Sequence, residues 1–334
     1  METDGMPGQK TVLVTGATGA IGPSLVHRLI EHDYQVHALV RTPPAPGLLW
    51  ERVKVFQGTI NEPDVVRAAM EGVDTVFHLA AKLHINNPRP EVRHEYSSIN
   101  IDGTRCLVAA AQQNAIRRLI FFSTINVYGP SHSGQELDEE TPAQPDSWYA
   151  ETKAAAEQIV LAGAPSVVMR LAAVYGPRMK GNYPRLLNAL AQRRFVMVGD
   201  GHNRRTLVHV ADVCSAALLV AEHPLAGGKT YNVTDGQVHT LREVIDTICL
   251  TLGQRSPRFH LPATPINLAA GLLEDALRTL GKGSPIERAT IQKLLEDVAV
   301  SGRKIQQQLG FCPRYDLISG WRQTVQSMMP DKEP

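Results

Sequence analysis

Aromatic residues are scarce in this chain, and its cysteines are few and scattered. Phe, Trp and Tyr account for 5% of the 334 residues, and the four cysteines form no CxxC pair: Cys106, Cys214, Cys249 and Cys312. Isolated cysteines are typical of reduced thiols in a cytosolic protein and argue against a disulfide framework or a zinc site. We therefore expect a cytoplasmic protein that holds no metal.

Charge of one sign and long apolar runs are also lacking. The formal net charge is +1, which is not the basic signature of a nucleic-acid-binding domain. No apolar run reaches the roughly 18 residues that a membrane-spanning helix requires. The first ten residues, METDGMPGQK, are too polar and acidic for a signal peptide. We expect neither a nucleic-acid partner nor a transmembrane segment.

What the sequence does contain is a regular alternation of apolar and amphipathic segments. Short apolar runs predict buried strands, whereas apolar residues spaced three and four apart predict helices. Strands that alternate with helices imply a parallel sheet covered on both faces, so we predict an α/β Rossmann-type fold with a doubly wound sheet. The predicted strands lie in 11–14, 34–41, 52–58, 73–81, 117–124 and 166–176, and the predicted helices in 23–33, 62–72, 98–115 and 148–164.

The alternation loosens beyond about residue 180. We assign residues 10–180 to a dinucleotide-binding Rossmann domain, with 204–236 returning to it. We expect residues 181–203 and 237–330 to form a smaller, mostly helical C-terminal part that binds the substrate. One segment there, 266–280, is amphipathic. It fits a lid over an apolar substrate, a surface that touches a membrane, or an ordinary core-facing helix. Its polar face is not rich in Lys or Arg, which argues against membrane binding.

A glycine-rich turn, TGATGAIG, joins the first predicted strand to the first predicted helix. Gly16 allows a tight turn, Gly19 lets the backbone approach a pyrophosphate at the helix N-terminus, and Gly22 lets helix and strand pack closely. This pattern between a strand and a helix predicts a dinucleotide site. We expect the intervening residues Thr18, Ala20 and Ile21 to contact the cofactor as well.

The end of the second strand indicates which nicotinamide cofactor is bound. An NAD site usually carries an Asp or Glu there for the ribose 2′-hydroxyl, whereas an Arg suits the 2′-phosphate of NADP. Val40 stands in the place of the acid, and Arg41 follows it. We therefore favour NADP. NAD stays possible if Arg41 only stacks on the adenine.

Seven segments together resemble the extended short-chain dehydrogenase/reductases, the NAD-dependent epimerase/dehydratase family. They are TGATGAIG, VFHLAA, NIDGT, FFSTINVYG, YAETK, RLAAVYGP and VHVADV, and they occur in the family's order. The resemblance covers about residues 10–250. It implies an enzyme with a nicotinamide cofactor and a homodimer formed through the helices around 100–115 and 148–164.

The resemblance also implies a catalytic set. Tyr149 and Lys153 match the family's YxxxK pair, and Thr124 matches its strand-end Ser/Thr. Tyr149 would then be the general acid/base, Lys153 would favour the phenolate and hold the nicotinamide ribose, and Thr124 would bind the reacting oxygen. A free tyrosine has a pKa of about 10, so it needs a nearby positive charge to act as a base at neutral pH. Residues four apart share one face of a helix.

Further positions follow from the resemblance. Thr59 and Ile60 take the place of the family's Asp-Leu/Ile at the adenine, and a hydroxyl there binds more weakly than a carboxylate. Asn100 either contacts the cofactor or bonds to a neighbouring loop, and His78 is expected to pack between strands. The family lines the cofactor with the segment after the fourth strand: Leu79, Ala80 and Ala81, with Lys82 either beside the substrate or merely solvated.

The substrate is less determined by the sequence. Arg205 occupies the position at which nucleotide-sugar epimerases hold a diphosphate, although members with other substrates share it. The segments around 228–236 and 252–283 resemble a branch with 3β-hydroxysteroid dehydrogenases. We therefore expect hydride transfer between nicotinamide and a secondary alcohol or ketone, with a nucleotide-sugar 4-epimerase as the alternative. A non-catalytic NADP-binding regulator is disfavoured because Tyr149 and Lys153 are both present.

Overall fold

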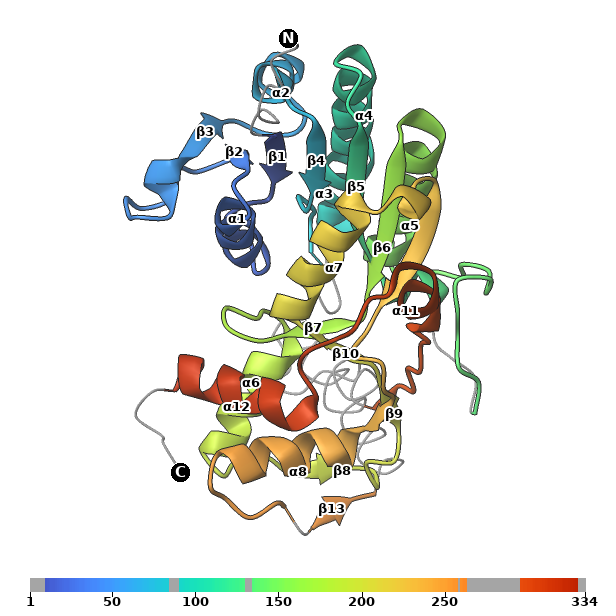
Figure 1. Cartoon of the computed structure of the whole chain (residues 1–334). Coiled ribbons are helices and arrows are strands. Elements are labelled where there is room, and N and C mark those ends of the chain that lie inside the picture. The colour runs from blue at the N-terminus through green and yellow to red at the C-terminus, as the bar shows by residue number, and fades with distance from the viewer. Residues whose placement is uncertain (1–9, 84–89, 130–133, 258, 263–294, 330–334) are drawn as a thin grey trace.

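A seven-stranded parallel sheet forms the centre of the larger, upper part of the protein (Figure 1). The computed structural model describes residues 10–83, 90–129, 134–257, 259–262 and 295–329. The strand order is β11-β6-β5-β4-β1-β2-β3, so the chain runs outward from β1 to β3 and then returns to build the other half. The predicted doubly wound sheet is confirmed. Its strands are β1 (Thr11–Thr15), β2 (Gln35–Val40), β3 (Val53–Gln57), β4 (Thr75–His78), β5 (Arg118–Thr124), β6 (Ser166–Leu171) and β11 (Lys229–Val233).

Helices cover both faces of the sheet because the buried strands turn successive side chains toward two apolar layers. In β1, Val12 and Val14 belong to one core with Leu25, whereas Leu13 belongs to a second core with Leu107. This is the period-two geometry of a strand. The first layer contains α1 (Gly22–Glu31), α7 (Val210–Glu222) and α11 (Arg303–Leu309), and the second contains α2 (Pro63–Met70), α4 (Gly103–Gln113) and α5 (Trp148–Gly163).

The helix predicted over 98–115 is divided in the structure. A π-helix, η3 (Ser97–Asp102), follows the short α3 (Arg93–Tyr96) and precedes α4. Asn100 is buried within η3. Such π turns are frequent at functional sites, and the spacing of apolar residues alone does not distinguish them from α-helix.

A smaller lobe lies below the sheet in Figure 1. Helices α6 (Asn182–Ala191), α8 (Leu241–Thr251) and α12 (Leu317–Met328) share an apolar core with Tyr175 of β7 (Ala173–Tyr175). The ring of Trp321 stacks on that of Tyr175, with centroids 4.9 Å apart. The remaining elements are η1 (Trp50–Arg52), η2 (Pro90–Val92), η4 (Ile125–Tyr128), β8 (Met197–Val198), β9 (Arg204–Arg205), β10 (Leu207–His209), η5 (Pro224–Ala226), β12 (His239–Thr240) and β13 (His260–Leu261).

The domain boundaries that we predicted stay a prediction. Strand β11 does return to the main sheet beside β6. The amphipathic helix predicted over 266–280 lies outside the described residues. None of the helices in the described ranges combines the length and apolar character that a membrane span requires.

Candidate active site

Most of the predicted site residues gather at one edge of the sheet because parallel strands end on the same side. The chain reverses its direction of winding between β1 and β4, which are neighbours in the sheet. Ligands bind in sheets of this type outside the carboxyl ends of the strands at that point. The glycine loop follows β1, Arg41 follows β2, Leu79, Ala80 and Ala81 follow β4, and Thr124 ends β5.

The three glycines of the loop have different physical reasons to be glycine. Gly16 has φ +71°, and a Cβ there would lie 2.7 Å from the Ala80 nitrogen. A Cβ at Gly22 would lie 2.2 Å from the Ala17 oxygen, so helix α1 packs too closely for any side chain. A Cβ at Gly19 would meet only the Gly16 oxygen, at 3.1 Å. The protein's own packing therefore hardly requires glycine at position 19, and a bound pyrophosphate would explain it.

Substitution separates these roles. We expect Gly19→Ala to melt within a few degrees of wild type, since its Cβ meets a single backbone atom that can shift slightly. The same variant should bind the dinucleotide at least about tenfold more weakly, because the methyl group occupies the path of the pyrophosphate. Gly22→Ala is the matched variant and should lose thermal stability. Equal dinucleotide affinity of Gly19→Ala and wild type by calorimetric titration would contradict the assigned site.

The residues that the sequence analysis predicts at the adenine make further contacts in the structure. Val40 is 3% exposed and packs in the core, while Arg41 is exposed. The Thr59 nitrogen and hydroxyl both donate to Glu62 Oε1 at 2.9 Å. The carboxylate of Glu62 therefore lies next to Thr59, three residues beyond the position where the family carries an Asp. Glu62 is the residue before the first residue of α2, Pro63. It lies only three residues after Thr59 in the sequence, and our prediction overlooked it.

Most other residues predicted at the cofactor line the same edge. The side chain of Ile60 does not line this edge. It packs against Gly103, where an added Cβ would lie 2.4 Å from Ile60 Cδ1. That side chain is buried beneath the start of α4, so Ile60 could contribute to a cofactor site only through its backbone. Thr18 is exposed, and these residues are half-buried: Ala20, Ile21, Leu79, Ala80 and Ala81.

Helix α5 carries Tyr149 and Lys153 against the end of β5. The helix begins at a cap in which Ser147 Oγ accepts from the Ala150 nitrogen at 3.3 Å. Tyr149 hydrogen-bonds to Thr124. Lys153 is 2% exposed, and its Nζ donates to the Phe122 oxygen at 2.6 Å. The structure thus brings the three predicted catalytic residues together at the carboxyl ends of the strands.

Burial disfavours the charged form of each residue, the phenolate of Tyr149 and the ammonium of Lys153. Burial raises the pKa of Tyr149 to about 12, although its hydrogen bond to Thr124 acts in the opposite direction. Burial lowers the pKa of Lys153 to about 7, with the charge of Glu157 partly opposing that shift. The protein alone therefore holds the tyrosine as a neutral acid. A bound oxidised nicotinamide would add positive charge, which favours the phenolate.

The depressed pKa of Lys153 predicts a pH dependence of stability. In the unfolded chain this lysine keeps its proton up to its ordinary pKa of 10.5, whereas in the fold it releases the proton near 7. Between those values the unfolded chain binds more protons, so the cofactor-free protein becomes more stable as pH rises. Melting temperatures from pH 7 to pH 10 should show this rise in wild type and a smaller one in Lys153→Met. Parallel curves would refute the burial of a titrating Lys153.

A buried ion pair lies one helical turn beyond Lys153. Arg170 of β6 holds Glu157 in a fork, with Nη2 to Oε2 at 2.7 Å and Nε to Oε2 at 3.1 Å. Ser123 Oγ also donates to the Glu157 carboxylate. The Arg170 guanidinium lies 4.8 Å from the ring centre of Tyr128. The pair ties α5 to two strands beneath the catalytic residues, and our sequence analysis did not identify it.

Asn100 of η3 and His78 of β4 are buried polar residues that bond to neighbouring segments. Asn100 Oδ1 accepts from the Lys82 nitrogen at 2.7 Å, and its Nδ2 donates to Thr152 Oγ1 at 3.0 Å. The sequence analysis left two alternatives for Asn100, a contact with the cofactor or a bond to a neighbouring loop. The bond to the Lys82 nitrogen is a contact of the second kind. His78 is fully buried between Thr15 and Thr104, at 2.8 Å and 3.0 Å. Burial lowers the pKa of His78 to about 3, so it is a neutral packing residue.

The two residues predicted at the substrate lie apart in the fold. Lys82 follows β4 and pairs with Glu95, whose carboxylate accepts from Lys82 Nζ. Arg205 lies on β9 in the smaller lobe, opposite His239 of β12, and donates to the Glu296 oxygen. No group of three or more His, Cys, Asp or Glu side chains suited to a metal occurs within the described ranges.

Comparison with known proteins agrees with this geometry. Residues 12–234 match the model of the NAD dependent epimerase/dehydratase family. The chain belongs to this family. It is 30% identical over 310 residues to a 4-hydroxy-2-methyl-3-oxo-4-farnesyl-3,4-dihydroquinoline-1-oxide ketoreductase of Stigmatella aurantiaca, covering 90% of this chain and 91% of that one.

Two further family members act as epimerases. An N-acetyl-alpha-D-glucosaminyl-diphospho-ditrans,octacis-undecaprenol 4-epimerase of Escherichia coli O157:H7 is 26% identical, covering 94% of each chain. The crystal structure of a Thermus thermophilus UDP-glucose 4-epimerase in complex with NAD superposes with a TM-score of 0.72 at 26% identity, covering 95% of this chain and 98% of that one. The protein is an enzyme of the short-chain dehydrogenase/reductase superfamily, which includes nicotinamide-dependent reductases, dehydrogenases and epimerases.

Proposed function

We propose that the protein is an NADP-preferring oxidoreductase that interconverts a secondary alcohol and a ketone. The observation that carries this is the placement of Thr124, Tyr149 and Lys153 at the sheet edge that also holds the glycine loop. Tyr149 gives or takes the proton at the reacting oxygen, Thr124 orients that oxygen, and Lys153 supplies nearby positive charge. The nicotinamide, when bound, supplies or accepts the hydride.

An apolar substrate is supported by the relatives. The ketoreductase is named for a farnesyl-bearing quinoline oxide, and the first epimerase for a sugar linked to undecaprenol. Both substrates carry an isoprenoid chain next to a polar reacting group. We propose an amphiphilic ketone or alcohol as the substrate of this enzyme.

A nucleotide-sugar 4-epimerase is the second candidate, and Arg205 and the similar UDP-glucose 4-epimerase favour it. A panel of ketones, alcohols and UDP-sugars with NADPH, NADH and their oxidised forms distinguishes the two. A net absorbance change at 340 nm with a ketone or alcohol supports the oxidoreductase. An altered UDP-sugar with no net change of cofactor would replace that proposal with epimerisation.

The exposed Arg41 supports NADP as the preferred cofactor. Val40 is buried, so the usual acidic partner of an NAD ribose is missing at the end of β2. We expect Arg41→Ala to weaken NADPH binding about tenfold or more, because charge-assisted bonds to phosphate are strong. NADH binding should change little, and Arg67→Ala on α2 serves as a control. Equal losses for both cofactors would exclude a 2′-phosphate contact.

We further propose a cytoplasmic homodimer. Helices α4 and α5 pack side by side on one face of the sheet (Figure 1). Two such pairs could meet as a four-helix bundle, as the family resemblance implies. Sedimentation velocity would show a species of twice the chain mass if this is correct.

A further inference from the structure

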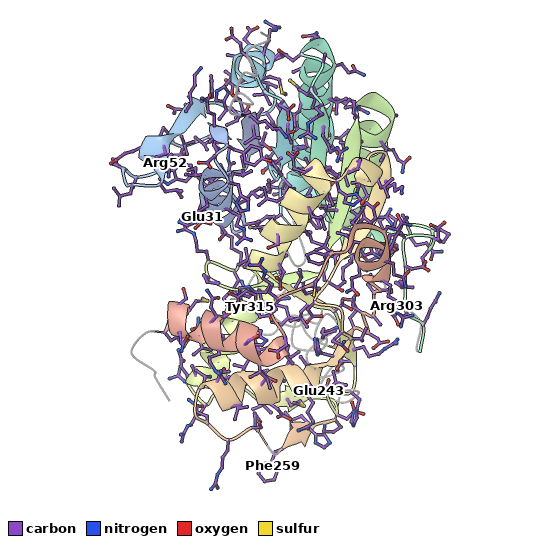
Figure 2. All side chains as sticks on the ribbon, viewed as in Figure 1. Glu31, Arg52, Glu243, Phe259, Arg303 and Tyr315 are labelled. Carbon is purple, nitrogen blue, oxygen red and sulfur yellow. The ribbon has the colours of Figure 1, made fainter. Side chains whose placement is uncertain are left out.

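The lower end of the smaller lobe joins exposed apolar residues to arginines. Phe259 projects from that end, away from the rest of the protein (Figure 2). Phe259 is 87% exposed, and the apolar residues Val196, Leu250 and Leu261 are exposed as well. Arginines lie close to these apolar residues in the sequence: Arg193 and Arg194 precede Val196, and Arg255 lies between Leu250 and Phe259. We call this surface the tip and define it by Arg193, Arg194, Val196, Leu250, Arg255, Phe259 and Leu261.

Pairing between segments distant in the sequence assembles the tip. Strand β13 runs parallel to β8, with His260 opposite Met197 and Leu261 opposite Val198. This pairing sets Phe259 and Leu261 beside Val196. The loop after α8 is tied to the end of α6, because Gln254 Nε2 donates to the Ala191 oxygen at 3.3 Å. A cavity of about 540 Å³ lies between those two segments, lined in part by Arg193, Phe195, Arg255 and Pro257.

The charge of the tip is of one sign. The described residues of 189–199 and 248–262 include three arginines and one histidine but no Asp or Glu, although the whole chain carries a net charge of only +1. The carboxylate of Asp200 lies at the rim, near His260. Large exposed apolar patches that are rimmed by polar residues mark protein or membrane interaction sites. Here they are combined with positive charge, which requires a partner that is both apolar and anionic.

We propose that the tip docks the enzyme on an anionic phospholipid bilayer. Phe259, Leu261, Val196 and Leu250 enter the boundary between headgroups and acyl chains, and the arginines contact the headgroup phosphates. A second copy of this chain fits less well, since a self-complementary contact would bring arginines against arginines. A nucleic acid would satisfy the arginines but not the aliphatic side chains. The proposal concerns a surface outside the catalytic edge and does not depend on the substrate.

Vesicle flotation tests the proposal with the full chain. Wild type should float with vesicles of phosphatidylglycerol mixed with phosphatidylcholine, and at least about tenfold less with phosphatidylcholine alone. High salt should weaken the binding, because it screens the arginines. Phe259→Ser/Leu261→Ser and Arg194→Gln/Arg255→Gln should each bind at least about tenfold more weakly. Their melting temperatures should match wild type, since the four side chains are exposed.

A matched control removes one exposed apolar residue and one exposed arginine elsewhere. Leu225 is 59% exposed, and the Arg67 side chain is 60% exposed. Leu225→Ser/Arg67→Gln should float as wild type does. Equal binding of wild type to both vesicle types, or unchanged binding of both tip variants, would overturn the proposal. Dimerisation lost in the Phe259 variant, without vesicle binding by wild type, would overturn it in favour of a second copy.

Discussion

Tyr149→Phe should lower turnover by about 10²–10⁴-fold, the usual contribution of a positioned general acid or base. Phenylalanine keeps the ring but removes the hydroxyl that bonds to Thr124. Binding of the reduced cofactor should stay within about threefold of wild type, because the phenol acts on the reacting oxygen and not on the dinucleotide. Steady-state rates at 340 nm and a fluorescence titration with NADPH measure the two quantities separately.

Tyr34→Phe is the matched control for this experiment. Tyr34 also has a hydrogen-bonded hydroxyl, which donates to Glu222 Oε1 at 2.6 Å, but it lies beside β2 on α7's side of the sheet. This variant should lose some stability and keep its turnover. If Tyr149→Phe retained near-normal activity, Tyr149 would not be the proton-transfer group. If both variants lost activity equally, the loss would reflect a general disturbance of the fold.

Glu157→Gln should destabilise the fold by about 3–5 kcal/mol, because it leaves a buried guanidinium without its counter-charge. The Arg170 side chain is 10% exposed and that of Glu157 is 1% exposed. Glutamine preserves the shape and can still bond to Ser123, so the missing charge is the main change. Urea denaturation gives the loss as a lower midpoint with an unchanged slope.

The double variant Glu157→Leu/Arg170→Met tests whether the loss comes from the unpaired charge. Removing both members of a buried pair is often nearly neutral. We therefore expect the double variant to be more stable than Glu157→Gln. A double variant that is less stable than the single one would show that the pair itself contributes net stability, contrary to our expectation.

The strands and the catalytic helix were predictable because their signals are local. The run Val12–Leu13–Val14 is apolar on both faces, which only a central parallel strand requires. The spacing of Tyr149 and Lys153 requires no knowledge of any other segment. The glycine loop is local as well, since its turn and its helix follow each other in the chain.

What escaped the sequence analysis depends on the register of distant segments. Glu157 meets Arg170 only because α5 packs on β6, and 13 residues separate the two. The π-helix that contains Asn100 was not predicted, because its sequence carries no signal that distinguishes it from an α-helix. The exposed tip depends on the pairing of β13 with β8. Each of these strands has only two residues, which is too short for the sequence to predict a strand. Glu62 was locally visible but was overlooked beside the position where an Asp was expected.

The central claim is that Tyr149 moves a proton at an oxygen whose carbon exchanges a hydride with the nicotinamide. The most direct measurement uses NADPH deuterated at either face of C4, together with the ketone that the activity panel identifies. One of the two labelled cofactors should transfer its deuterium to the carbinol carbon of the product, as mass spectrometry and NMR would show. A reduced product without deuterium from either cofactor would contradict hydride transfer at this site.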